Sequence, residues 1–382
     1  MARPDDLLRW NPRYLATVAA PAAALPILRL DGLRPREAAA LRRAAEAAGA
    51  RVVLGRPGAP QRPALVAGTP AQQAALAERL GGALGRAIAA TLAHQHGPPP
   101  PPTRLGATTW AWGARTYVMG VLNLSPDSFS GDGLPDVTAA VARARAFVAA
   151  GADILDVGGE STRPGAPPLP AEAELARVLP VLAALRAAVP LPLSIDTYKA
   201  AVAEAALAAG AVLVNDATGL RRDPALAAVA AAHGAALVIT HNRPAAASAG
   251  PLGPHHASVD YADLLGEVLR DLRAAVTRAE AAGLPPAQIL VDPGIGFGKT
   301  REQNLALLAR LGELRALGRP LLLGTSRKSV IGLTLGLPPD QREEGTAATV
   351  ALGIRAGADV VRVHDVPSQA LVTRLADAIE RG

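Results

Sequence analysis

The chain has 382 residues, a formal net charge of +6 and no cysteine, and the lack of cysteine excludes disulfides and cysteine-based zinc or redox chemistry. Its arginines are scattered among acidic residues, and only 3% of its residues are aromatic, so we expect no nucleic-acid partner. No uncharged run approaches the roughly 18 residues of a membrane span, and the charged start is unlike a signal peptide. We therefore expect a cytoplasmic protein with no membrane partner.

The first part of the chain, residues 1–97, predicts a small α/β domain. Its expected strands and helices are, in chain order, 26–30, 35–48, 51–54, 64–67 and 70–80. It has no loop that would cradle a phosphate and no cluster of metal ligands, so the sequence assigns it no role. Five prolines follow at 98–102 and mark an extended linker. We place the linker and lead-in at 98–112 and a catalytic domain at 113–382.

The rest of the chain alternates between apolar, strand-like runs and helical stretches rich in alanine and leucine. The strands are expected to end at Leu122, Gly158, Asp196, Asn215, Thr240, Asp292, Gly324 and His364. The helices are expected at 137–150, 172–188, 199–209, 224–232, 261–282, 303–317 and 345–356, with a last one after Val366. This alternation predicts a (β/α)8 TIM barrel preceded by the small N-terminal α/β extension. An open doubly wound sheet, the alternative, usually has fewer strands.

In such barrels the chemistry lies at the rim where the strands end. The polar residues expected at this rim are Asn123, Thr162, Arg163, Asp196, Asn215, Asp292, Lys328, Arg362 and His364. The chain has only three lysines, Lys199, Lys299 and Lys328, and each follows a predicted strand. Their placement is a further indication of a site at the rim.

The loop after Asp292 nearly matches a nucleotide-binding P-loop, because Gly298, Lys299 and Thr300 supply the end of that motif. Its first glycine, however, is replaced by Pro293, which has no N–H to offer a phosphate. We therefore favour a sharp glycine turn that presents Phe297 over the rim.

Arg362 and His364 stand two residues apart on the last strand and share one face, where they suit phosphate oxygens. A salt bridge at the strand end, with Asp365, is the alternative. The stretch 324–329 leads into a helix at Ser329, a start that favours an anion. The long loops 123–133 and 158–168 are candidate lids.

Asp196, Asn215 and Asp292 offer carboxylate and amide groups that match the N–H donors and acceptors of an aminopyrimidine edge. A flat, nitrogen-rich heterocycle bound deep in the barrel, with anions nearer the mouth, is the ligand that this set favours.

With these residues the chain resembles the dihydropteroate synthases of folate biosynthesis. The matching stretches are MGVLNLSPDSFSGDG (119–133), DILDVGGESTRPGA (153–166), SIDTYK (194–199), VND (214–216), DPGIGFGK (292–299), SRKS (326–329) and RVHDV (362–366). They occur in this order between 116 and 366, whereas the first 100 residues lie outside the resemblance.

The resemblance implies an enzyme that joins 7,8-dihydropterin pyrophosphate to p-aminobenzoate with Mg²⁺, releases pyrophosphate and is a sulfonamide target. It implies that the pterin contacts Thr162, Asp196, Asn215, Asp292 and Lys328, and that the pyrophosphate contacts Asn123, Arg362 and His364. Asn123 would help to place Mg²⁺. The p-aminobenzoate site would be formed by Phe129, Arg163, Pro164, Phe297 and Ser329. The family also suggests a homodimer through barrel helices.

One position departs from the family pattern. The chain has Thr240 directly before His241, where family members commonly have methionine, so one wall of the pterin pocket is expected to lose apolar contact. Two other functions stay open from the sequence. A pterin-binding methyltransferase module would keep the pterin residues but would not need the loop 161–165 or the 326–329 and 362–366 motifs, all of which are present. A non-catalytic pterin-binding paralogue is the other function, and the intact lid loops argue against it.

Overall fold

The computed structural model describes residues 26–55, 62–124, 133–161, 168–245 and 255–382. The chain divides into two compact units, and the boundary between them lies after Pro98. No helix in the described ranges is long and apolar enough to cross a membrane.

The first unit is a three-stranded antiparallel sheet packed against helices. The strands β1 (Ile27–Leu33), β2 (Arg51–Leu54) and β3 (Arg62–Ala67) take the order β1-β3-β2. The helices are α3 (Pro35–Ala47), α4 (Pro70–Leu80) and α5 (Gly82–His96). Leu41 and Leu76 of α3 and α4 are fully buried and pack with Leu28 and Val66 of the sheet. The unit therefore has its own apolar core.

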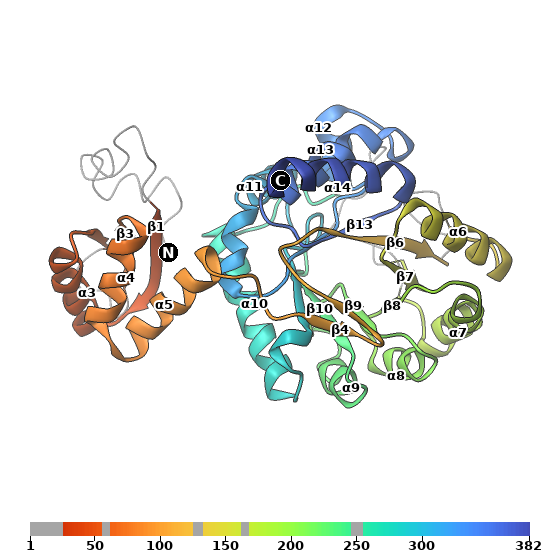
Figure 1. Cartoon of the computed structure of the whole chain (residues 1–382), viewed down its shortest axis with the longest axis horizontal. Coiled ribbons are helices and arrows are strands. Elements are labelled where there is room, and N and C mark those ends of the chain that lie inside the picture. The colour runs from red at the N-terminus through yellow and green to blue at the C-terminus, as the bar shows by residue number, and fades with distance from the viewer. Residues whose placement is uncertain (1–25, 56–61, 125–132, 162–167, 246–254) are drawn as a thin grey trace. The chain divides into compact units, whose positions relative to one another are not determined.

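The second unit contains an eight-stranded parallel sheet that curves into a barrel inside a ring of helices (Figure 1). Its strands are β6 (Tyr117–Asn123), β7 (Ile154–Gly158), β8 (Leu193–Asp196), β9 (Leu213–Asp216), β10 (Ala236–Thr240), β11 (Ile289–Asp292), β12 (Leu322–Leu323) and β13 (Val360–Val363). A parallel bridge between Val291 and Leu321 joins β11 to the start of β12 and closes the ring. The predicted TIM barrel is confirmed, and each predicted strand end lies within one residue of the observed end.

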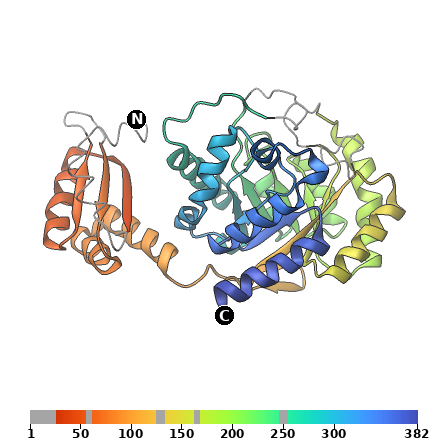
Figure 2. The same ribbon diagram turned by 90° about the horizontal axis from the view of Figure 1, so that it is seen from above.

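The helices outside the strands are α6 (Val137–Ala150), α7 (Ala171–Ala188), α8 (Ala200–Ala208), α9 (Leu226–Ala232), α10 (Leu264–Ala281), α11 (Arg301–Ala309), α12 (Ser329–Leu335), α13 (Glu343–Arg355) and α14 (Val366–Arg381). The view from above in Figure 2 shows several of them around the strands. The prediction of one helix over 303–317 is wrong, because α11 ends at Ala309 and the 3₁₀-helix Leu311–Leu317 follows. Gly312 in this stretch is a poor α-helix former, which favours the break.

The amino end of the barrel is filled by a hairpin that the sequence had placed in the linker and lead-in. Strands β4 (Thr103–Leu105) and β5 (Thr108–Trp110) pair antiparallel. Trp110 stacks on Tyr117 with ring centroids 4.1 Å apart, and Leu105 joins the same buried cluster as Met119. This cluster forms an apolar floor beneath the polar end of the barrel, so the hairpin belongs to the barrel rather than to a free linker.

Candidate functional site

Polar side chains replace apolar ones toward the carboxyl ends of the barrel strands. Val360 and Leu290 belong to the apolar floor of the barrel. Because side chains alternate between the two faces of a strand, Arg362 and Asp292, two residues further along, face the same interior. The strand pattern thus brings residues from distant parts of the sequence into one group.

Arg362 lies at the centre of this group and joins two carboxylates. Its Nε donates to Asp156 Oδ2 at 2.6 Å, and its Nη2 donates to Asp196 Oδ2 at 2.7 Å. Burial works against the charged guanidinium, but the attraction of Asp156 and Asp196 outweighs it and raises the pKa of Arg362. Arg362 is therefore a permanent cation at the centre of the barrel.

Asp156 is a member of the site that the sequence reasoning missed. Its side chain is fully buried, and it accepts hydrogen bonds from Ser194 Oγ at 2.5 Å and Asn215 Nδ2 at 2.9 Å in addition to that from Arg362. The prediction considered the last residue of each strand, whereas Asp156 stands two residues before the end of β7. A carboxylate inside the apolar run ILDVG was the signal that would have found it.

Asp196 combines a charged partner with an unpaired acceptor. Burial raises its pKa from 3.8 to about 7, against the attraction of Arg362, and the neighbouring Asp156 adds to the rise. Within the described part of the chain its buried Oδ1 has no hydrogen-bond partner. A buried acceptor without a partner is costly, so this oxygen is a natural position for an N–H group of a ligand.

Asp292 and Lys328 form a second part of the site. Gly294 N donates to Asp292 Oδ1 at 2.6 Å, and Lys328 Nζ donates to Ile295 O at 2.6 Å. Lys328 Nζ also lies 4.6 Å from the centroid of the Phe297 ring. Burial lowers the pKa of Lys328 to about 8 although Asp292 favours its charged form, and burial raises the pKa of Asp292.

Two glycines leave space between these side chains. A Cβ atom on Gly324 would lie 3.7 Å from Lys328 Nζ and 3.8 Å from both Asp292 Oδ2 and Arg362 Cβ. A Cβ atom on Gly158 would lie 3.7 Å from both Asn123 Oδ1 and Asp196 Oδ2.

Five side chains predicted from the sequence therefore converge around Gly158 and Gly324. They are those of Asn123, Asp196, Asp292, Lys328 and Arg362. Asn215 pairs with Asp196 in the sheet and joins them.

The other predicted residues lie around this group or outside the described ranges. His364 Nδ1 lies 3.0 Å from Ser326 Oγ, which fixes the orientation of the ring, and Ser329 begins α12. Thr240 is buried and pairs with Asp292 across β10 and β11. The predicted residues outside the described ranges are Phe129, Thr162, Arg163 and Pro164.

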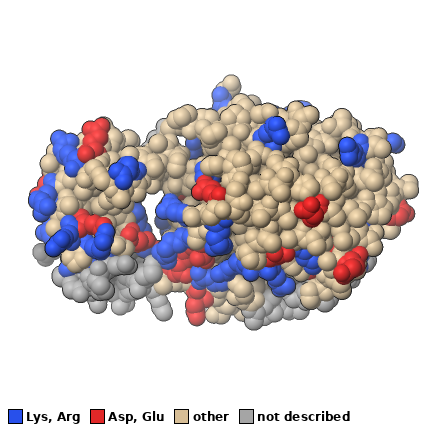
Figure 3. Space-filling view, turned by 90° about the horizontal axis from the view of Figure 1, so that it is seen from below, with Lys and Arg blue, Asp and Glu red and all other residues tan. Residues whose placement is uncertain are grey.

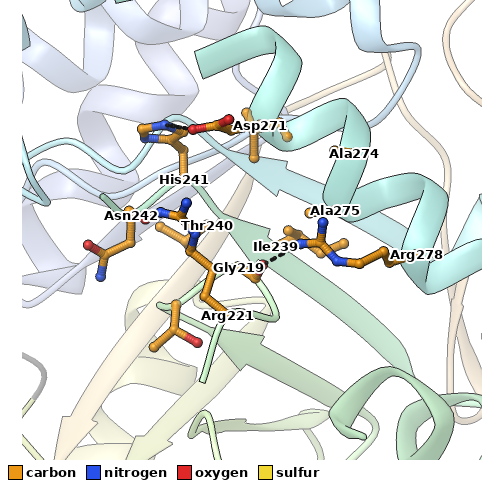
Figure 4. Close-up of a pocket in the computed structure, with 12 residues that line it drawn as sticks. Gly219, Arg221, Ile239, Thr240, His241, Asn242, Asp271, Ala274, Ala275 and Arg278 are labelled. Carbon is orange, nitrogen blue, oxygen red and sulfur yellow. Dashed lines mark hydrogen bonds and ion pairs between the residues drawn. The ribbon is translucent and has the colours of Figure 1, made fainter. Parts of the chain in front are cut away.

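A separate pocket, partly open to solvent, lies outside the strands against α10 (Figure 4). Its lining includes Arg221, Asn242 and Arg278, together with Asp271 and His241. Figure 4 shows the His241 ring directed toward Asp271 across this pocket. Of the predicted residues only Thr240 lines it, and none of Asn123, Asp196, Asn215, Asp292, Lys328 and Arg362 does, so it is distinct from the group in the barrel.

On the face shown in Figure 3, Lys and Arg side chains lie among Asp and Glu side chains. The expectation that nucleic acid is not a partner stays a prediction.

Known proteins are similar to the part of the chain that forms the barrel. Residues 119–364 match the family model described as pterin binding enzyme. Dihydropteroate synthase from Synechocystis sp. is 47% identical over 284 residues, which cover 74% of this chain and 96% of that protein. The enzyme of the same name from Bacillus subtilis is 46% identical over 266 residues, which cover 69% of this chain and 89% of that protein.

Solved structures agree with these matches. The crystal structure of dihydropteroate synthase from Clostridium difficile in the presence of pteroic acid has 45% sequence identity and a TM-score of 0.65, and the match covers 72% of this chain and all of that chain. The enzyme from Burkholderia cenocepacia complexed with 7,8-dihydropteroate has 38% identity and a TM-score of 0.65, covering 74% of this chain and 97% of that chain.

We predict that the carboxyl carbon of Asp196 titrates near pH 7 in an NMR experiment. The pKa in the folded chain lies above the ordinary 3.8, so the folded state binds this proton more tightly than the unfolded state. The contribution to the free energy of unfolding is therefore full below about pH 4 and is lost as the pH rises to about 7. The resonance should be absent from Asp196→Asn, and a titration below pH 5 would contradict the prediction.

Proposed function

The chain belongs to the pterin-binding enzyme family, and on this premise we propose how its residues carry out the function of a dihydropteroate synthase. This transferase condenses 6-hydroxymethyl-7,8-dihydropterin diphosphate with p-aminobenzoate to give 7,8-dihydropteroate and pyrophosphate. The observation that supports the assignment most strongly is the buried Oδ1 of Asp196 in the family-matched region, which no described residue hydrogen-bonds.

We assign pterin recognition to the carboxylate and amide groups inside the barrel. Asp196 Oδ1 would accept an N–H of the pterin, and Asn215 and Asp292 would pair with other parts of its polar edge. Lys328, which already lies beside Asp292 and Phe297, would pack over the ring and bond its polar edge. Thr162, which lies outside the described ranges, would complete this pocket. The polar groups are buried and fixed before the ligand arrives, so little reorganisation opposes binding.

The reaction breaks the bond between the methylene carbon and the diphosphate oxygen, and the electron pair leaves with the diphosphate. Arg362 and His364, with Asn123, would bind the departing anion and lower the barrier by opposing its charge. The electron-rich pterin would support the cationic methylene, and the amine nitrogen of p-aminobenzoate then forms the new C–N bond and loses a proton. No nucleophile from the protein is needed.

Mg²⁺ is part of the proposal. Magnesium usually takes one or two protein oxygens and completes its octahedral shell with phosphate oxygens and water. Asn123 Oδ1, which faces the space over Gly158, is an oxygen of this kind, so the residues present fit the ion. Once bound, Mg²⁺ supplies positive charge to the diphosphate. In the described ranges no three His, Asp or Glu side chains gather in an arrangement that could hold a metal ion.

The p-aminobenzoate site would lie on the outer side of Lys328. Phe297 contacts Lys328, and Ser329 follows it at the start of α12. Phe129, Arg163 and Pro164, which lie outside the described ranges, would complete this site. Phe297 thus places the second substrate next to the proposed position of the pterin.

We propose that the protein forms a homodimer through barrel helices. Exposed apolar side chains support this proposal, because Leu371, Leu375 and Ile379 of α14 and Leu352 of α13 are 59–72% exposed. Sedimentation velocity would measure the state, and a monomer at micromolar concentration would contradict the proposal. Cytoplasmic localisation stays a prediction of the sequence.

The test of the function is pyrophosphate release from 6-hydroxymethyl-7,8-dihydropterin diphosphate with and without p-aminobenzoate, in the presence of Mg²⁺. We expect release that depends on p-aminobenzoate and formation of an equal amount of 7,8-dihydropteroate. A methyltransferase module or a non-catalytic paralogue would bind the pterin without this release, and that outcome would refute the function.

Gly324→Ala should raise the KM for the pterin substrate by about tenfold or more, because the added methyl group occupies space needed by the ring. The contacts of 3.7–3.8 Å around the added Cβ are ordinary ones, so we expect the melting temperature to change little. Gly151→Ala is the control. Gly151 has open space around it but a φ of +95°, so its substitution should lower stability and leave KM unchanged. An unchanged KM in Gly324→Ala would place the pterin elsewhere.

A further inference from the structure

Lys299 carries a buried ammonium group that the proposed reaction does not use. Its residue is 2% exposed, and burial lowers its pKa well below the ordinary value. Its Nζ lies 2.8 Å from Gly294 O, 2.9 Å from Phe297 O and 2.9 Å from His241 Nδ1. These three acceptors match the three donors of an ammonium group, so the group is fully satisfied although it is buried.

The acceptors come from two different segments of the barrel rim. Gly294 and Phe297 belong to the loop after β11, whereas His241 follows β10. The same segments are also in direct backbone contact, since His241 N donates to Asp292 O at 2.9 Å. A Cβ atom on Gly294, whose φ is +69°, would lie only 1.7 Å from His241 O. Lys299 therefore fastens the loop to its neighbour where the backbones are in contact.

His241 is in turn held by α10. Its Nε2 lies 3.3 Å from Asp271 Oδ2, and Figure 4 shows this pair. Burial lowers the pKa of His241 to about 4, and the charge of Lys299 acts in the same direction, so the ring is neutral at neutral pH. The negative charge of Asp271 beside Nε2 favours the tautomer with its proton on that nitrogen, which leaves Nδ1 as the acceptor that Lys299 needs. The chain of contacts runs from Asp271 through His241 to Lys299.

The far side of the same loop faces the active site. Ile295 O accepts from Lys328 Nζ, and the half-buried Phe297 ring lies 4.6 Å from that atom. The carbonyl of Phe297 is bonded directly by Lys299, so the residue is held through its own main chain. A shift of this loop would move the ring relative to Lys328.

We propose that Lys299 is a positioning residue of the synthase, which acts through Phe297 to orient p-aminobenzoate beside the pterin. Lys299 itself touches no substrate. The inference rests on the proposed function, because it takes p-aminobenzoate as the molecule that Phe297 contacts.

The test compares Lys299→Met with the wild-type enzyme in the pyrophosphate-release assay, well below both melting temperatures. Methionine keeps the length of the side chain and removes the ammonium. We expect the KM for p-aminobenzoate to rise by about tenfold or more, because a small displacement of a positioning group is costly. Arg319→Met is the matched control, since it removes a mostly buried cation, paired with Glu280, from the amino end of the barrel. This variant should lose stability and keep its KM within about twofold.

A double-mutant cycle distinguishes positioning from a general structural role. If Lys299 acts through Phe297, the variant with both Lys299→Met and Phe297→Ala should have the same KM for p-aminobenzoate as Phe297→Ala alone. Independent effects that multiply would overturn the proposal. An unchanged KM in Lys299→Met would also overturn it.

If Lys299→Met does not fold, Asp271→Ala decides the question. Asp271 is 39% exposed in its side chain, so this substitution is compatible with folding, and it removes the negative charge that favours this tautomer of His241. We expect its KM for p-aminobenzoate to rise by about threefold or more, and an unchanged value would overturn the proposal. Failure of the proposed function would look different, because the wild-type enzyme would then release no pyrophosphate in response to p-aminobenzoate.

Discussion

Arg362 holds two buried carboxylates, Asp156 and Asp196, inside the barrel, and the arrangement of the site depends on this ion cluster. Removing one member of such a cluster leaves an uncompensated buried charge, which typically costs about 3–5 kcal/mol. The cluster is also short of positive charge, because one guanidinium faces two carboxylates. Burial raises the pKa of Asp196, and the attraction of Arg362 does not cancel this rise because Asp156 repels a second negative charge. The cluster also leaves an acceptor, Asp196 Oδ1, that a substrate N–H can satisfy.

The barrel makes this cluster possible by separating an apolar floor from a polar mouth. Met119, Leu290 and Val360 pack with the Trp110 hairpin at the amino end, so the floor is apolar. Two residues further along the same strands, polar side chains occupy the interior. The loops then add a second level of order, since the glycine turn after Asp292 supplies both a donor to that carboxylate and an acceptor to Lys328. Binding groups are thus fixed by strands and loops together.

Much of this could be predicted from the sequence, for identifiable reasons. An apolar run that stops at Asp196 or Asp292 marks both the end of a strand and a site residue, because parallel strands place their last residues at one rim. Asp156 was missed because it stands inside its strand, where its one signal is a carboxylate within an apolar run, and the ion pair with Arg362 then shows its role.

The contacts of Lys299 could not be predicted from the sequence. The sequence places it at a loop, but its partner His241 follows a different strand, and no local pattern joins the two. The break between α11 and the following 3₁₀-helix was hidden by a continuous helical pattern. These features depend on contacts between distant segments.

The most direct measurement of the central claim is a crystal structure of this protein with 7,8-dihydropteroate bound. We expect the pterin ring inside the barrel, with one N–H within hydrogen-bond distance of Asp196 Oδ1 and the ring next to Lys328 and Asp292. A ring bound in the pocket against α10, or outside the strands altogether, would contradict the assignment of the buried ion cluster to substrate recognition.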